Sequence, residues 1–241
     1  MVNLFILLIL HMIGDFYLQT SRTVICRGAG ADAECAACVS RRKILLRVRR
    51  IALHALVYVA PFLFLLHTTK WFNVAAIMGV LMLSHAIVDA LSCRLNKKWK
   101  HILVFILDQG LHIAVLFGVY MLFDFNGIFS RYASVARVIF AVLAITVPSS
   151  VFINKVFYDL YPESGYGEIF DVGSVIGMFE RILVLIFACF EDFAAIAIII
   201  TIKTWARSSD LKDSTEFRNK YLLGTLSSLV LALAVFLIYR L

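Results

Sequence analysis

Histidines and aspartates recur at a spacing of four residues in the apolar stretches of the first half of this 241-residue sequence. Residues at positions i and i+4 lie on one face of a helix, one turn apart, so each pair predicts two side chains that project from the same helix wall. An ionisable group in an apolar environment is costly unless another group compensates it, so we expect the seven side chains to converge. The set is His11 and Asp15, His85 and Asp89, Asp108 and His112, and the single His54.

A divalent metal is the compensating group that this mixture favours. Imidazole and carboxylate together suit zinc, iron or manganese, as one ion or as two, and a set without thiolates argues against a structural zinc–thiolate site. We take zinc as the first candidate and Asp15 or Asp108 as a catalytic general base. The alternative is a metal-free network of His–Asp pairs that joins helices or relays protons. The predicted metal ligands are His11, His54, His85, Asp89 and His112.

Further polar residues adjoin this set or share its character. Gln19 and Gln109 are predicted to orient a ligand or a substrate, unless they only mark the interfacial ends of helices. Glu180 is predicted to join the cluster if its helix begins on the cytoplasmic side of the membrane, and otherwise to form an interhelical ion pair. Lys203 and Arg207, four residues apart, are predicted to contact lipid phosphate or a phosphorylated substrate.

The composition places these residues in a membrane protein. The chain is 62% hydrophobic and 16% charged, and its mean hydropathy is +0.90, outside the range of soluble domains. Because backbone groups in lipid must be satisfied internally, apolar stretches near 20 residues predict helices. We expect an all-α, polytopic transmembrane helix bundle with six or seven crossings. The seven stretches are Val2–Leu18, Ile51–His67, Phe72–Cys93, Ile102–Phe123, Val135–Phe157, Val172–Ile202 and Tyr221–Tyr239.

Basic residues predict the orientation. The loop Thr20–Arg50 is rich in arginine and is expected on the cytoplasmic side, which leaves the N-terminus outside. This orientation places the seven histidines and aspartates in the cytoplasmic half of the bilayer. Simple alternation then puts the basic loop Lys203–Lys220 outside, so one crossing is in doubt. The two stretches whose crossing is in doubt are Val135–Phe157 and Val172–Ile202. The first contains Pro148 and, if it does not cross, is re-entrant or lies at the membrane surface. The second is overlong for one crossing.

We predict one membrane unit with a division near Asp124–Ser134. Residues 1–124 form a four-helix region with the His/Asp cluster, and residues 125–241 contribute two or three helices. The net charge of +7 lies mostly in short loops beside the helices, so nucleic acid is not an expected partner. Cys26, Cys35 and Cys38 in the first loop are open to a metal or redox role, or to none.

The chain resembles a family of bacterial membrane proteins known as domain of unknown function 3307. The resemblance is carried by His11-Met-Ile-Gly-Asp15, His85-Ala-Ile-Val-Asp89 and Asp108-Gln-Gly-Leu-His112, and by stretches in the second half such as Lys203-Thr-Trp-Ala-Arg207. It implies that both halves belong to one unit and implies no activity. The layout is also similar to intramembrane metal hydrolases of the ceramidase and adiponectin-receptor type, by analogy only.

Three functions remain open, and so does whether the protein is an enzyme. The first is a metal-dependent hydrolase of a lipid or lipid-linked substrate at the cytoplasmic leaflet, in a bacterial plasma membrane. The second is a transporter or ion-coupled permease that uses the cluster as a cation or proton site, although no inverted repeat is visible. The third is a non-enzymatic sensor or assembly factor. Membrane lipids are the expected partners in each case.

Overall fold

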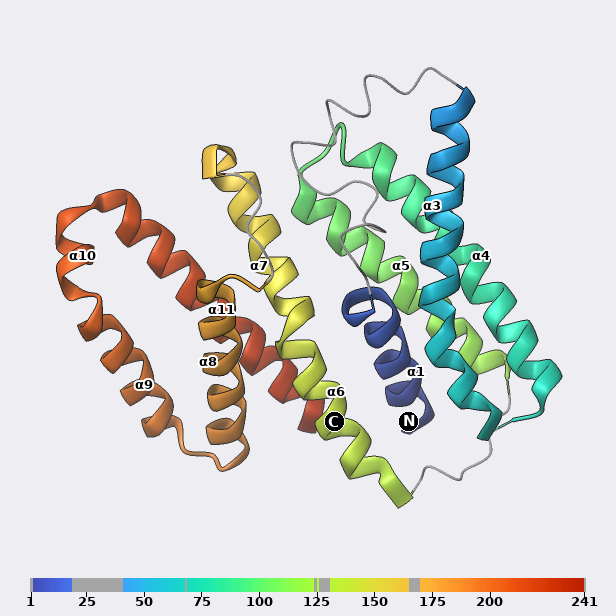
Figure 1. Cartoon of the computed structure of the whole chain (residues 1–241). Coiled ribbons are helices and arrows are strands. Elements are labelled where there is room, and N and C mark those ends of the chain that lie inside the picture. The colour runs from blue at the N-terminus through green and yellow to red at the C-terminus, as the bar shows by residue number, and fades with distance from the viewer. Residues whose placement is uncertain are drawn as a thin grey trace. The chain divides into compact units, whose positions relative to one another are not determined.

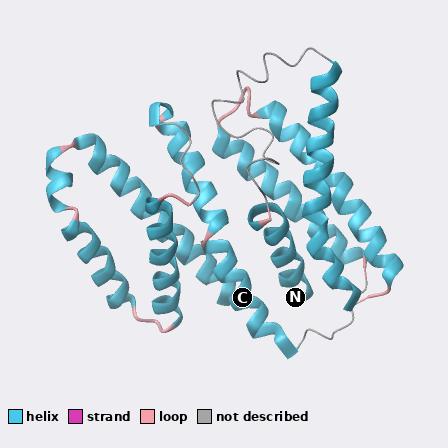
Figure 2. Ribbon diagram, in the orientation of Figure 1, coloured by secondary structure: helices cyan, strands magenta, loops and turns pink. Residues whose placement is uncertain are grey.

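The computed structural model describes residues 2–18, 41–67, 69–123, 125, 131–164 and 170–240, and all regular structure in these ranges is helical (Figure 2). Five helices within them are long and apolar enough to cross a membrane, and three shorter apolar helices accompany them. The prediction of an all-α membrane protein is confirmed. Gln19, Cys26, Cys35 and Cys38 lie outside the described residues, so their predicted roles stay predictions.

The chain divides into two compact units. The first comprises Met1–Phe140 with Tyr158–Tyr166, and the second comprises Ala141–Phe157 with Gly167–Leu241. The boundary falls inside a helix, at Phe140–Ala141, whereas the division expected from sequence was placed near 124–134.

The first unit is built on α1 (Val2–Met12), α3 (Arg41–Val59), α4 (Trp71–Leu95) and α5 (His101–Leu122) (Figure 1). The π-helix η1 (Ile13–Tyr17) extends α1, and the 3₁₀-helix η2 (Ala60–His67) extends α3. Pro61 has no N–H to donate, which accounts for the change of helix type at the start of η2. The basic run that the sequence placed in a loop instead begins α3 at Arg41.

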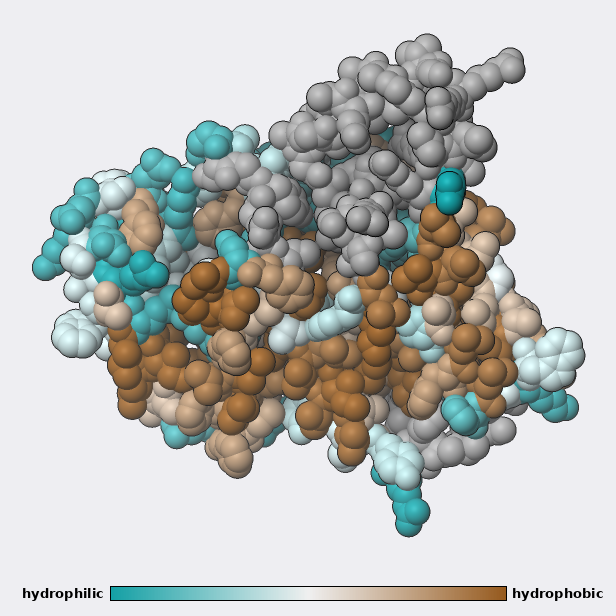
Figure 3. All heavy atoms as spheres, in the orientation of Figure 1, coloured by the Kyte–Doolittle hydropathy of each residue, from teal (hydrophilic) through white to brown (hydrophobic). Residues whose placement is uncertain are grey.

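Apolar side chains divide between the core of the first unit and its outer surface. Leu7, Phe62 and Ile77 are fully buried between its helices. Leu83 and Met121 are two of many large hydrophobic residues that are exposed on the outer faces of α4 and α5. Hydrophobic residues cover the middle of the helices in Figure 3, while hydrophilic residues gather toward helix ends. Lipid is the solvent that this surface requires.

The second unit contains part of α6 (Ala133–Ile145) and of α7 (Val147–Leu160), followed by α8 (Val172–Cys189), α9 (Phe193–Ala206), the short α10 (Ser208–Asp213) and α11 (Thr215–Arg240). The overlong stretch Val172–Ile202 is therefore two helices. They are joined by the turn Phe190–Asp192, in which Glu191 adopts a positive φ of 60°. The Asp192 carboxylate caps α9 by accepting a hydrogen bond from the backbone N–H of Ala195 at 3.0 Å.

A kink joins α6 and α7, so that Ala133–Leu160 is one bent helix long enough to cross a membrane. Pro148 cannot donate to the carbonyl of Ala144, and the Ser149 hydroxyl donates to that carbonyl instead, at 2.8 Å. The buried Arg181 guanidinium also donates to the carbonyl of Ile145 at the kink. Side chains thus satisfy the freed backbone groups, as helix breaks in lipid require.

Candidate metal centre

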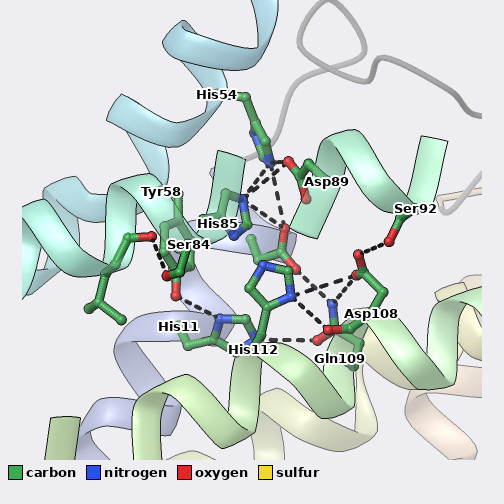
Figure 4. Close-up of polar contacts among 12 residues, drawn as sticks. His11, His54, Tyr58, Ser84, His85, Asp89, Ser92, Asp108, Gln109 and His112 are labelled. Carbon is green, nitrogen blue, oxygen red and sulfur yellow. Dashed lines mark hydrogen bonds and ion pairs between the residues drawn. The ribbon is translucent and has the colours of Figure 1, made fainter. Parts of the chain in front are cut away.

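The His/Asp cluster is assembled entirely within the first unit. The chain brings all seven predicted residues together from α1, η1, α3, α4 and α5. Figure 4 labels six of them, the four histidines with Asp89 and Asp108, and shows their polar groups turned toward one another. The four histidines are at most 3% exposed. The side chains of Asp15, Asp89 and Asp108 are 10%, 18% and 15% exposed.

The π-helix brings one carboxylate into this cluster. A Cβ added to Gly14 would collide with the backbone carbonyl oxygen of Tyr58, so the backbones of η1 and α3 are in direct contact there. Only glycine permits this approach. The next residue, Asp15, consequently lies against His54 of α3. Single π-turns of this kind occur frequently at functional sites.

Carboxylate oxygens of Asp15 and Asp89 lie close to two imidazole nitrogens. The Nε2 atoms of His54 and His85 lie 3.0 Å apart. Each lies 3.4 Å from Oδ2 of Asp89, and they lie 3.7 and 3.9 Å from Oδ1 of Asp15. In a tetrahedral site with bonds of about 2.0–2.1 Å, neighbouring ligand atoms are about 3.3 Å apart. The five distances bracket that value, and Asp15, His54 and His85 form a set of three residues whose ligand atoms could hold a metal ion.

Hydrogen bonding alone does not account for these distances. The carboxylate oxygens of Asp15 and Asp89 lie at 3.4–3.9 Å from the imidazole nitrogens, beyond the usual 2.7–3.2 Å of an N–H···O bond. Two rings that face each other through Nε2 can share only one proton between them. An ion bound by both Nε2 atoms and a carboxylate oxygen would need no shared proton.

His112 provides a further nitrogen suited to a metal. Its Nδ1–H donates to the backbone carbonyl of Asp108 at 2.8 Å, which fixes the tautomer and leaves Nε2 with a lone pair. Within the described part of the chain this buried Nε2 has no hydrogen-bond partner, and neither has Nδ1 of His85. Ligand atoms of His85, Asp89 and His112 lie within 4.8 Å of one another, so the cluster offers a second set of three.

Gln109 connects the cluster to the remaining aspartate. Its Oε1 accepts a hydrogen bond from Nε2–H of His11 at 3.2 Å, and its Nε2 donates to Asp15 and Asp108 at 3.0 and 3.1 Å. Asp108 also accepts a hydrogen bond of 2.5 Å from the Ser92 hydroxyl. Gln109 thus lies where it can orient both carboxylates.

Tyr58 also belongs to the site, although it was not predicted from the sequence. Its ring stacks on His85, with centroids 3.8 Å apart and planes 5° apart. Its hydroxyl lies 3.1 Å from Nδ1 of His11, which accepts because Nε2 of that ring donates to Gln109. Both nitrogens of His11 are therefore engaged in hydrogen bonds, and its predicted ligand role stays a prediction. Tyr58 lies four residues after His54, and this spacing indicates that both side chains share one face of the helix.

The other predicted polar residues lie in the second unit. Glu180 pairs with Lys203 at 2.6 Å, which is the interhelical ion pair that the sequence left open for it. Arg207 is exposed and lies 3.5 Å from Asp210. Neither Glu180 nor Arg207 is among the groups that assemble the His/Asp cluster.

Fold and site together define a helical membrane protein with buried histidine and aspartate groups that could hold a metal ion. The chain belongs to the family described as a protein of unknown function (DUF3307), whose model matches residues 3–140. This match ends where the main segment of the first unit ends, so the second-half motifs of the expected resemblance lie outside it. No curated protein and no solved structure matches the chain.

Proposed function

We propose that the protein is a metal-dependent hydrolase of a lipid or lipid-linked substrate, with a divalent ion, zinc first among the candidates, held by Asp15, His54, His85 and Asp89. The observation that supports this most directly is that the Nε2 atoms of His54 and His85 lie 3.0 Å apart, with carboxylate oxygens of Asp15 and Asp89 at 3.4–3.9 Å from them. A bound ion of this kind polarises a carbonyl or phosphoryl oxygen as a Lewis acid.

Asp108 is the general base in this proposal. Of the two predicted candidates, Asp15 is in the ligand set, whereas Asp108 lies beside it and is oriented by Ser92 and Gln109. The Asp108 carboxylate is partly exposed, as a group that accepts a proton from an attacking water must be. Ring contacts between His112 and both His11 and His85 close the cluster on the side of α5.

The depth of the cluster supports a substrate drawn from one leaflet. Asp89 lies six residues before the end of α4 at Leu95, and Asp108 seven residues after the start of α5 at His101. At about 1.5 Å per residue, both carboxylates are within about 10 Å of their helix ends. This is the depth of the lipid ester and headgroup region rather than of the bilayer centre.

Asp108→Asn is the variant that tests catalysis. We expect it to retain bound metal and to lose about 10²–10⁴-fold in turnover, because the amide cannot accept the proton. Purified protein is assayed against lipid esters, lipid phosphates and lipid amides. Asp210→Asn, on the exposed α10, is the control and keeps its activity. Metal-dependent cation uptake into proteoliposomes, with no hydrolysis of any of the three bond types, would replace the hydrolase by a transporter.

We also propose eight crossings, with both termini outside and the basic loops inside, in a bacterial plasma membrane. Five long and three shorter apolar helices make up this number. The hairpin of α8 and α9 adds a crossing that the sequence reading lacked, and it moves the basic segment Lys203–Lys220 to the side of the other basic loops. Within the second unit, Arg240 pairs with Glu191, which places the end of α11 beside the α8–α9 turn.

Epitope tags test this topology. A tag inserted at Glu191 is expected to be accessible from outside intact cells, together with a C-terminal tag, whereas a tag at Asp210 is accessible only after permeabilisation. A tag after Thr69 is the control for an outside turn. External access at Asp210 would rule out the eight-crossing arrangement.

A further inference from the structure

A cavity of about 340 Å³ lies within the second unit, between α7, α8, α9 and α11. Its volume is in the range of small-ligand sites, and its lining is unusually polar for a membrane-spanning unit. Ser150, Arg181, Lys203, Lys220, Thr225 and Ser228 are among the residues that line it.

Arg181 forms the buried part of this lining. Its guanidinium is 2% exposed and donates to the hydroxyls of Ser150 and Ser228 at 2.7 and 3.2 Å, as well as to carbonyls at the α6–α7 kink. Within the described ranges no carboxylate lies within ion-pair distance of it. The neighbouring Glu180 carboxylate acts on Arg181 electrostatically but is paired with Lys203, so an anion that enters the cavity would add compensation for this buried cation.

Two further cations line the cavity nearer the helix ends. Lys203, close to the end of α9, and Lys220, close to the start of α11, are each about a quarter exposed. Lys203 donates to Glu180 and Lys220 donates to Glu216, each at 2.6 Å, and an ammonium group has three donors. The lining of the cavity therefore includes three cationic side chains.

The Thr225 hydroxyl is a second, independent indication of a ligand. Its Oγ1 is buried and has no hydrogen-bond partner in the described part of the chain, although it lines the cavity. Buried polar groups nearly always have a partner, so the missing partner is expected to come from the occupant. Gly177 of α8 and Gly224 of α11 also line the cavity, and a Cβ there would crowd Arg181 and Phe157 respectively.

We propose that this cavity binds the phosphate group of a lipid headgroup. A phosphate offers several acceptor oxygens for guanidinium, ammonium and hydroxyl donors. Lys203 and Lys220 lie near helix ends, the level at which a membrane lipid carries its phosphate. The carboxylates of Glu180 and Asp171 also line the cavity. They can accept a hydrogen bond from a hydroxyl or ammonium group of the headgroup. The site is distinct from the His/Asp cluster and does not depend on the proposed hydrolase.

Thr225→Val tests the site without disturbing the fold, since valine replaces an unsatisfied hydroxyl by a methyl group of similar size. Full-length protein in neutral detergent is titrated with short-chain phosphatidic acid and followed by native mass spectrometry. We expect roughly tenfold weaker binding for Thr225→Val, from loss of one hydrogen bond to a charged group, with an unchanged thermal midpoint. Lys220→Gln is expected to weaken binding to a similar degree, whereas Arg218→Gln, two residues away on α11, leaves it unchanged.

Competition separates the possible sources of the phosphate. Inorganic phosphate that binds as tightly as the lipid would support the phosphate site and name free phosphate as its ligand. A diacylglycerol of the same chain length that binds as tightly as phosphatidic acid would overturn the proposal, and so would equal affinity of wild type and Thr225→Val. Metal content is measured in parallel and stays unchanged in all variants, so failure here is distinguishable from failure of the metal centre.

Discussion

Replacing His85 by alanine is expected to abolish stoichiometric metal binding. The imidazole of His85 is fully buried and lies within 4 Å of His54, Asp15 and Asp89 through its Nε2 atom. Loss of an outer hydrogen-bonding partner of a metal site already costs roughly 10–100-fold in affinity, and loss of a ligand costs more. Elemental analysis of protein purified without chelator should therefore show metal in the wild type and less than about a tenth of it in His85→Ala.

His67→Ala is the matched control for this experiment. His67 is an exposed histidine at the end of η2, in the same unit but outside the cluster. Its removal should leave the metal content unchanged. Wild-type protein without metal, or His85→Ala with a full complement of it, would support the metal-free polar network and remove the basis of the hydrolase proposal.

Gly14→Ala is expected to have the largest effect of any single-methyl substitution in the first unit. The added Cβ meets the backbone carbonyl of Tyr58, and neither backbone can rotate away as a side chain would. Overpacking of this kind costs about 1–3 kcal/mol, and we expect a value near the upper end. Separation of η1 from α3 would also move Asp15 away from His54, so metal content should fall together with the thermal midpoint.

Gly118→Ala provides the comparison. Gly118 lies on α5 with no atom within 4 Å of the position of an added Cβ, so alanine there should raise helix stability by about 0.5–1 kcal/mol. Thermal denaturation in detergent, with and without added zinc, measures both variants. Equal thermal midpoints for Gly14→Ala and Gly118→Ala would contradict the close backbone contact between η1 and α3.

Much of the fold could be predicted because helix formation in lipid is a local requirement. Runs of apolar residues must satisfy their own backbone groups, so the spans Phe72–Cys93 and Ile102–Phe123 agree closely with α4 and α5. The turn between α8 and α9 could not be predicted in this way. It contains no glycine or proline, and Glu191 adopts there a left-handed conformation in which non-glycine residues are uncommon.

The sequence alone determined which residues could do chemistry and which face of each helix they share, because a spacing of four residues follows from helix geometry alone. Only the tertiary structure decided which of these side chains meet. It placed Asp15 against His54 through the contact at Gly14, engaged both nitrogens of His11 in hydrogen bonds, and paired Glu180 with Lys203. These outcomes depend on the packing distance and rotation of neighbouring helices, which no spacing within one helix encodes.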